Sequence, residues 1–162
     1  MPELNSKHLM SLDLDVDPLS SHQIGQVQAG RRVIVPINGG SFTGSYDGET
    51  LEGKVEPGGF DWVLFSPDGV MKIDVRIVLT TSKQETIYAQ YQGRLLVADD
   101  SVHKKMASGE QLDANEYSLV TTVKFETGSE RLKGLNNAVA VAEGRQTGYQ
   151  PSYEIFEIGA LS

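Results

Sequence analysis

The sequence predicts an all-β protein, an antiparallel barrel or sandwich with about eight to ten strands and at most one short helix. Three observations predict it. Apolar and polar residues alternate with a period of two in many short segments, turn-forming residues separate these segments, and 17 of the 162 residues are glycine. Short strands at regular spacing, divided by polar turns, are typical of antiparallel barrels and sandwiches.

The alternation is clearest in residues 71–79, where every second residue from Met71 to Leu79 is apolar. Such a period places the apolar side chains on one face of a strand and the polar ones on the other. Residues 100–109 favour one helical turn or a loop, which ends at Gly109. Further strands are predicted at residues 11–17, 33–37, 51–55, 62–65, 86–92, 117–125, 138–142 and 153–158.

The length of 162 residues fits one domain. Pro18 and two serines interrupt the first predicted strand, so we expect residues 1–23 to form an irregular N-terminal segment with one strand. The barrel domain is then expected to span residues 24–162. Pro36 indicates that the strand around it lies at an edge of the sheet, and an incompletely closed sheet predicts a homodimer.

Composition excludes several classes of partner and cofactor. With 14 Lys and Arg against 22 Asp and Glu, the net charge is -8, which disfavours nucleic acid and anionic membranes as partners. There is no cysteine, and the three histidines are not at metal-ligand spacing, so we expect neither a metal nor another cofactor. No apolar run is long enough for a membrane span and no secretory signal begins the chain, which predicts a cytoplasmic protein.

The polar residues on predicted strands are the candidates for a site. Asp74 and Arg76 share the face opposite the apolar residues of their strand. Either this face meets water, or it faces the barrel interior, where buried charges must pair with one another or with a polar ligand. Asp61 precedes Trp62, the only tryptophan, and Tyr88 and Tyr91 lie on opposite faces of their strand.

The order of motifs resembles an uncharacterised family known as domain of unknown function 3237, or uncharacterised protein family 0311, over about residues 24–158. The motifs are residues 38–44 (NGGSFTG), 51–62 (LEGKVEPGGFDW), 68–69 (DG), 74–76 (DVR), 88–93 (YAQYQG), 125–128 (FETG), 135–136 (LN) and 153–158 (YEIFEI). The resemblance implies a single antiparallel β-barrel of the lipocalin or calycin kind, without a settled activity. It adds Phe125, Thr127 and Asn136 to the candidate residues.

Two departures from the family pattern bear on the ligand. The family usually has an Arg-Thr pair shortly before its Phe-Glu-Thr-Gly motif, where this chain has residues 119–124 (LVTTVK). It usually has an aromatic residue before Leu-Asn, where this chain has Gly134. Both changes remove polar or aromatic groups, which implies a different, larger and more apolar ligand.

With the resemblance, we place Asp74 and Arg76 inside the barrel, near a cavity that Trp62 and either Tyr91 or Tyr88 also line. This predicts a cofactor-independent lyase, isomerase or cyclase acting on an apolar aromatic or polyketide-like small molecule. Asp61 or Asp74 would move a proton and Arg76 would hold an oxyanion. The residues expected to bind the substrate are Trp62, Tyr88, Tyr91, Phe125, Thr127 and Asn136. The alternative is a non-catalytic carrier of a hydrophobic metabolite.

Overall fold

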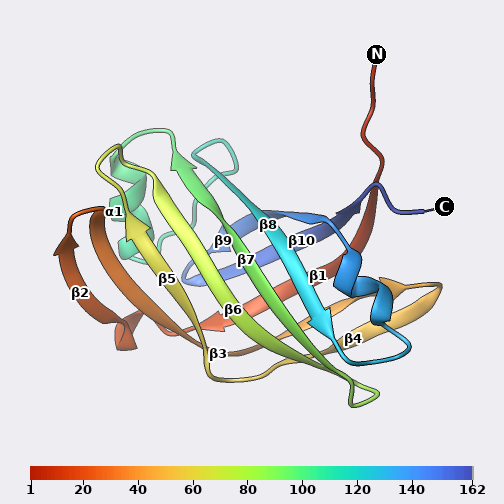
Figure 1. Ribbon diagram of the computed structural model, residues 1–162. Helices are drawn as coiled ribbons and strands as arrows, with labels where there is room; N and C mark the ends of the chain where they lie inside the picture. Colours follow the sequence, from red (N-terminus) through yellow and green to blue (C-terminus); the bar gives the residue numbers. More distant parts are fainter. Residues whose placement is uncertain (162) are drawn as a thin grey trace.

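The computed structural model describes residues 1–161, which contain ten β-strands, one α-helix and two short 3-10 helices (Figure 1). The strands are β1 (Ser6–Val16), β2 (His22–Val27), β3 (Gly30–Tyr46), β4 (Glu49–Val55), β5 (Gly59–Phe65), β6 (Met71–Thr81), β7 (Thr86–Val97), β8 (Tyr117–Thr127), β9 (Ala140–Thr147) and β10 (Gln150–Ile158). The helices are η1 (Pro18–Ser20), α1 (Ser101–Ala107) and η2 (Lys133–Asn137). The all-β fold class with one short α-helix is confirmed.

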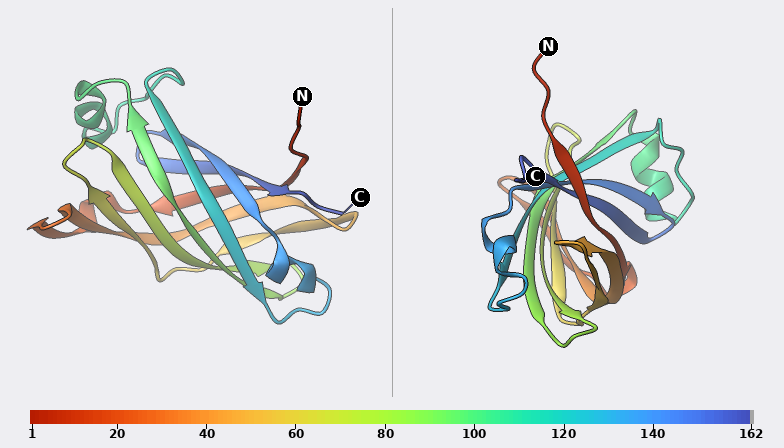
Figure 2. Two further views of the ribbon diagram at one scale, coloured as in Figure 1. Left: turned by 45° about the horizontal axis from the view of Figure 1, so that its top comes forward. Right: turned by 90° about the vertical axis from the view of Figure 1, so that its right-hand side faces the viewer.

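The strands form one closed antiparallel barrel (Figure 2). From β6 to β10 each strand pairs with the next along the chain, and β10 pairs with β1. The long strand β3 pairs with β1 and β2 along one edge and with β4 and β5 along the other. β1 with β2, and β4 with β5, therefore each fill one position, which gives a barrel of eight strand positions.

The N-terminal segment is part of this barrel, contrary to its expected place before it. β1 runs along both β10 and β3 and so completes the ring of strands. Its side chains Met10, Leu12 and Leu14 are buried in the core. Gly44 on β3 allows this contact, since a Cβ there would collide with the backbone of β1. The strand predicted over residues 11–17 is thus part of a core strand, β1, which ends at Val16.

The two ends of the barrel differ. At one end, which we call the closed end, Leu132 and Leu135 around η2 are fully buried. The chain termini lie at this end, and α1 lies at the other, which we call the helix end (Figure 2). There, His103 Nε2 on α1 donates a hydrogen bond to the Gly69 carbonyl oxygen at 2.9 Å, and Val102 is buried. β2 also lies at the helix end, where it pairs with β3 alone among the described strands.

An ion-pair network joins three connections at the closed end. Arg131 binds Glu85 with two hydrogen bonds, at 2.9 Å and 2.6 Å, and contacts Glu49 at 3.1 Å. Ser129 and Thr81 also donate to Glu85. The pKa of Glu85 is lowered from 4.5 to about 2. The Arg131 side chain is the main cause and the two hydroxyls add to it, whereas desolvation acts in the opposite direction. The network stabilises the segment that carries the buried leucines.

We expect replacement of Arg131 by Met to lower the free energy of unfolding by about 1–3 kcal/mol at pH 7, because a bidentate pair to a largely buried carboxylate is lost. Glu85 has a lowered pKa in the fold, so its contribution is present above pH 4.5 and is lost as the pH falls toward 2. Urea unfolding of parent and variant should therefore converge over this range. Lys133→Met, which breaks only the exposed pair with Glu130, is the control and should cost little. A pH-independent difference would contradict this account.

Candidate functional site

Asp61 is a carboxyl-bearing residue on the inner face of the barrel wall. It lies on β5 opposite Val75 of β6 and Val35 of β3, and Val75 is a core residue. Residues directly opposite one another in a sheet point to the same side. Asp61 and Val35 each keep some solvent-accessible surface, whereas Val75 is buried. The Asp61 side chain therefore faces the interior at a place that solvent can still approach.

A gap in the β-ladder provides the hydrogen-bond donor for this carboxyl. β5 and β6 pair on both sides of Trp62 and Val63, but the ladder is interrupted at these two residues. The Asp74 main-chain N–H donates to Asp61 Oδ1 at 3.2 Å. The Trp62 carbonyl oxygen accepts a hydrogen bond from Arg32 Nη1 at 2.9 Å. Two main-chain groups that a regular ladder would have paired thus bind side chains.

Two tyrosines share the interior with Asp61. Tyr91 of β7 and Tyr153 of β10 are buried, and their ring centroids are 5.0 Å apart at an interplanar angle of 55°. Small residues on the inner faces of neighbouring strands leave room for the rings; a Cβ at Gly144 would collide with Leu119 and would also crowd Tyr153. Tyr91 lies directly across from Val75, so it shares a row with Asp61.

Burial dominates the ionisation of these groups. Desolvation raises the pKa of Asp61 from 3.8 to about 7; the Asp74 N–H acts against this rise and the Asp74 charge adds to it. Burial also raises the pKa of Tyr91 and of Tyr153 well above the usual value, and the nearby Asp61 carboxylate adds to both shifts. Near pH 7 the site therefore holds a carboxyl group that is partly ionised beside two phenols that stay protonated.

Four of the predicted site residues lie on the outer face of the barrel, so the prediction that they line an interior cavity is wrong. Asp74 is partly exposed and Arg76 is exposed, because the apolar residues of β6 fill the interior. Trp62 is 43% exposed, on the opposite face of β5 from Asp61. Tyr88 points outward and donates a hydrogen bond to Gln90 Oε1 at 3.2 Å.

Two further candidates have structural contacts at the closed end. The Thr127 N–H donates to Asn136 Oδ1, and Asn136 Nδ2 donates to the carbonyl oxygens of Thr127 and Lys133. These bonds hold η2 against β8. Phe125, in contrast, is buried on the inner face of β8, like Tyr91 on the inner face of β7. Of the predicted residues, the fold therefore brings Asp61, Tyr91 and Phe125 into the interior.

Two interior groups were missed in the sequence. Tyr153 begins the motif 153–158. It lies two residues before the apolar Ile155, so the two side chains share the inner face of β10. Thr121 lies in the segment that departs from the family pattern; it is 1% exposed, and its hydroxyl has no hydrogen-bond partner among residues 1–161. A buried hydroxyl without a partner is available to a ligand.

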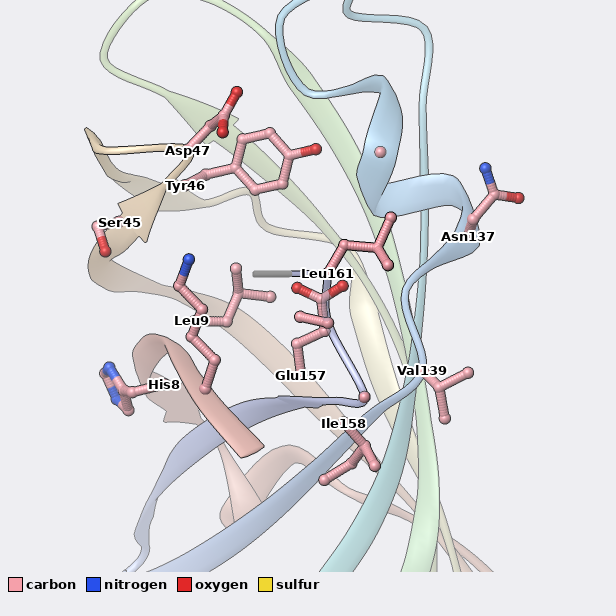
Figure 3. A pocket seen from close by; sticks show the side chains of 14 residues that line it. His8, Leu9, Ser45, Tyr46, Asp47, Asn137, Val139, Glu157, Ile158 and Leu161 are labelled. Carbon is pink, nitrogen blue, oxygen red and sulfur yellow. The ribbon is translucent and has the colours of Figure 1, made fainter. Parts of the chain in front are cut away.

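A pocket of about 440 Å³ lies at the closed end, away from Asp61 (Figure 3). Figure 3 shows the side chains of Leu9 and Glu157 toward its middle, with Leu161 beside them. Tyr46 also lines it, and its hydroxyl occupies the place of a side chain at Gly134, where a Cβ would collide with it. Tyr46 thus fills the space next to the position where the family usually has an aromatic residue.

Two kinds of site are absent from residues 1–161. No three His, Asp or Glu side chains there gather as a group that could hold a metal ion. No helix in the same range has the length and apolar character needed to cross a membrane.

Comparison with known proteins finds one family and several structures of the same fold. A family model described as "Protein of unknown function (DUF3237)" matches residues 4–158, which include β1. A UPF0311 protein of Clostridium acetobutylicum is 33% identical over 141 residues, which are 86% of this chain and 84% of that protein. A UPF0311 protein of Bradyrhizobium diazoefficiens is 25% identical over 87% of this chain and 88% of its own length.

Solved structures agree with the barrel. A β-barrel-like protein of Acinetobacter baumannii has a TM-score of 0.80 and 29% identity, with 98% of each chain covered. A protein of unknown function from Clostridium acetobutylicum has a TM-score of 0.81 and 29% identity, with coverage of 97% and 100%. An enzyme from Penicillium herquei has a TM-score of 0.69 and 20% identity, with coverage of 98% and 97%, which shows a shared fold.

We expect the Asp61→Asn variant to become more stable than the parent as the pH rises. The pKa of Asp61 is raised in the fold, so the folded protein holds a proton that the unfolded chain loses above pH 3.8, and the parent's stability falls between about pH 4 and 7. The amide removes this loss, so the difference in free energy of unfolding should grow by roughly 2–4 kcal/mol over this range. Asp74→Asn is the matched control and should keep most of the parent's pH dependence, because the Asp74 charge is the smallest cause of the raised pKa of Asp61. Parallel stability curves for parent and Asp61→Asn would show that the carboxyl is not buried.

Proposed function

The chain belongs to the family of proteins of unknown function DUF3237, and from its interior we propose that it is an acid–base enzyme in which Asp61 is the proton-transfer group. The observation that carries the proposal is a carboxyl group with a pKa of about 7 on the inner face of the barrel, beside Tyr91 and Tyr153. A general base is most effective when its pKa lies near the working pH. Perturbed groups of this kind gather at functional sites.

The proposed step is removal of a proton from a carbon next to a carbonyl group. The C–H bond breaks, Asp61 takes the proton, and the electron pair moves to the carbonyl oxygen to give an enolate. The neutral Tyr91 and Tyr153 hydroxyls donate hydrogen bonds to this oxygen, which stabilises its charge in a largely dry interior. Protonated Asp61 then returns the proton at another carbon, or to a leaving group, which corresponds to an isomerase or a lyase.

The inner face of β5 leads from the helix end to Asp61, and we infer that substrate reaches the carboxyl along it. Phe65, Val63 and Asp61 alternate along this face, and four residues of a strand span roughly 13 Å. The closed end is filled by buried leucines, and Val102 of α1 is buried at the helix end, so substrate entry from the helix end requires α1 to move aside. The residues on the path are apolar and aromatic, which favours a small aromatic substrate.

The entrance to this path carries a positive group. The Arg31 guanidinium lies 4.2 Å from the centroid of the Phe65 ring, on the same face as Asp61. Arg31 forms no ion pair with another residue of 1–161. An aromatic substrate with an anionic group can therefore stack near Phe65 and bind Arg31. The fold itself is compatible with catalysis, since one structural relative is described as an enzyme.

Exchange of hydrogen for deuterium tests the proposed step without knowledge of the complete reaction. The protein is incubated in deuterium oxide with a panel of aromatic compounds that bear a hydrogen beside a carbonyl group, and labelling is followed by mass spectrometry. We expect one class to be labelled at a rate that rises with pH through about 7, because ionised Asp61 is the base. Asp61→Asn should slow labelling at least 100-fold, and Tyr91→Phe about 100-fold.

Asp74→Asn is the matched control, because Asp74 adjoins Asp61 with its side chain outside the barrel, and it should label at nearly the parent rate. Compounds that bind and return unlabelled would support a carrier instead. Labelling that survives in Asp61→Asn would assign the reaction to another group.

Binding of 2-naphthoate and 2-naphthamide tests the role of Arg31, because the two compounds share a shape and differ in charge. We expect the acid to bind at least about tenfold more tightly, which corresponds to 1.4 kcal/mol. Arg31→Gln should remove this preference, while Arg145→Gln, on the outer face of β9, should keep it. Equal binding of acid and amide to the parent would exclude Arg31 as the group that recognises an anion.

A further inference from the structure

The outer wall over β5, β6 and β7 carries an aromatic and charged surface that the proposed reaction does not use. The strand register, continued across the interruption at Trp62, arranges it in two rows. The first row is Trp62, Asp74 and Gln92, and the second is Phe60, Arg76 and Gln90. Val78 and Tyr88, directly opposite each other, extend it toward the closed end. We call these eight residues the outer patch; several belong to the family motifs that the interior site left without a role.

The outer patch has the composition of a binding surface. Trp62 is 43% exposed and Val78 is 41% exposed. Phe60 lies beside Trp62, with ring centroids 6.4 Å apart. Tryptophan, tyrosine and arginine are the residue types that contribute most to protein–protein binding, and Trp62, Tyr88 and Arg76 bring all three together. Exposed apolar surface of this kind, mixed with charge, marks an interaction site.

The outer patch is self-complementary in charge, because it carries one acidic and one basic side chain. Asp74 and Arg76 are separated by one residue on β6, roughly 7 Å along the strand. They form no ion pair with each other or with another residue of 1–161. The bond from Gln92 Nε2 to Asp74 Oδ1 is long, at 3.4 Å. The patch therefore presents one negative and one positive group, each free for a partner of opposite sign.

We propose that the outer patch is the interface of a two-fold symmetric homodimer. A two-fold axis that lies in the interface, perpendicular to β6 and between Asp74 and Arg76, places the first row of each copy over the second row of the other. Asp74 then meets Arg76 of the partner subunit, and the same pair recurs on the other side of the axis. The same operation places Trp62 over Phe60 of the partner subunit. A single axis thus pairs both the charges and the aromatic rings.

Charge reversal tests this arrangement in the full chain by sedimentation equilibrium at micromolar concentration. The parent should sediment at twice the chain mass of 17.7 kDa. Arg76→Asp places acidic groups opposite each other twice and should raise the dissociation constant at least about 100-fold, as should Asp74→Arg with basic groups. The double variant Asp74→Arg/Arg76→Asp restores opposite charges and should dimerise to within about tenfold of the parent. Arg145→Asp, on β9 and three strands from β6, is the control.

Fluorescence gives a second readout, because Trp62 is the only tryptophan. Dilution of the parent should shift its emission to the red as the indole becomes exposed, in step with dissociation. A parent that sediments as a single chain would overturn the proposal. So would a dimer that survives both single reversals, or a double variant that stays monomeric, since each would show that the outer patch serves another partner or none.

Discussion

The hydrogen bond from the Asp74 main-chain N–H to Asp61 Oδ1, at 3.2 Å, determines what the barrel interior can do. A carboxyl group on the inner face of an apolar wall would otherwise lack a donor, and burial of a polar group without one is costly. The interrupted ladder between β5 and β6 supplies that donor from the backbone. One such bond holds the carboxyl in place, but it does not offset desolvation, so the pKa stays at about 7.

The rest of the barrel is consistent with this single polar centre. The closed end is filled by Leu132 and Leu135 and held by the Arg131–Glu85 pair, and Val102 of α1 is buried at the helix end. Glycines and alanines on the inner faces leave room for the rings of Tyr91 and Tyr153. Ion pairs and buried leucines thus stabilise the closed end, while the interior holds one carboxyl group with a single main-chain donor.

The fold class followed from the sequence because period-two alternation is a local property, and β6 and β7 showed it clearly. The sequence did not show which face of each strand points into the barrel. Asp74 and Arg76 are on the polar face of β6, and only the three-dimensional register shows that this face is outside. Asp61 was identified beside Trp62, but its pairing with Tyr153 joins strands about 90 residues apart in the chain, which no local pattern reveals. The N-terminal strand was underrated because Pro18 interrupts the chain just after it.

Titration of the Asp61 carboxyl carbon by ¹³C NMR, assigned with the Asp61→Asn variant, tests the central claim most directly. The account predicts one carboxyl resonance that titrates with a pKa near 7, far above the ordinary 3.8 of aspartate. It also predicts that this resonance is absent from the variant and keeps its raised pKa in Asp74→Asn. A pKa near 4 for Asp61 would place the carboxyl in water, and the interior would then have no group suited to proton transfer at neutral pH.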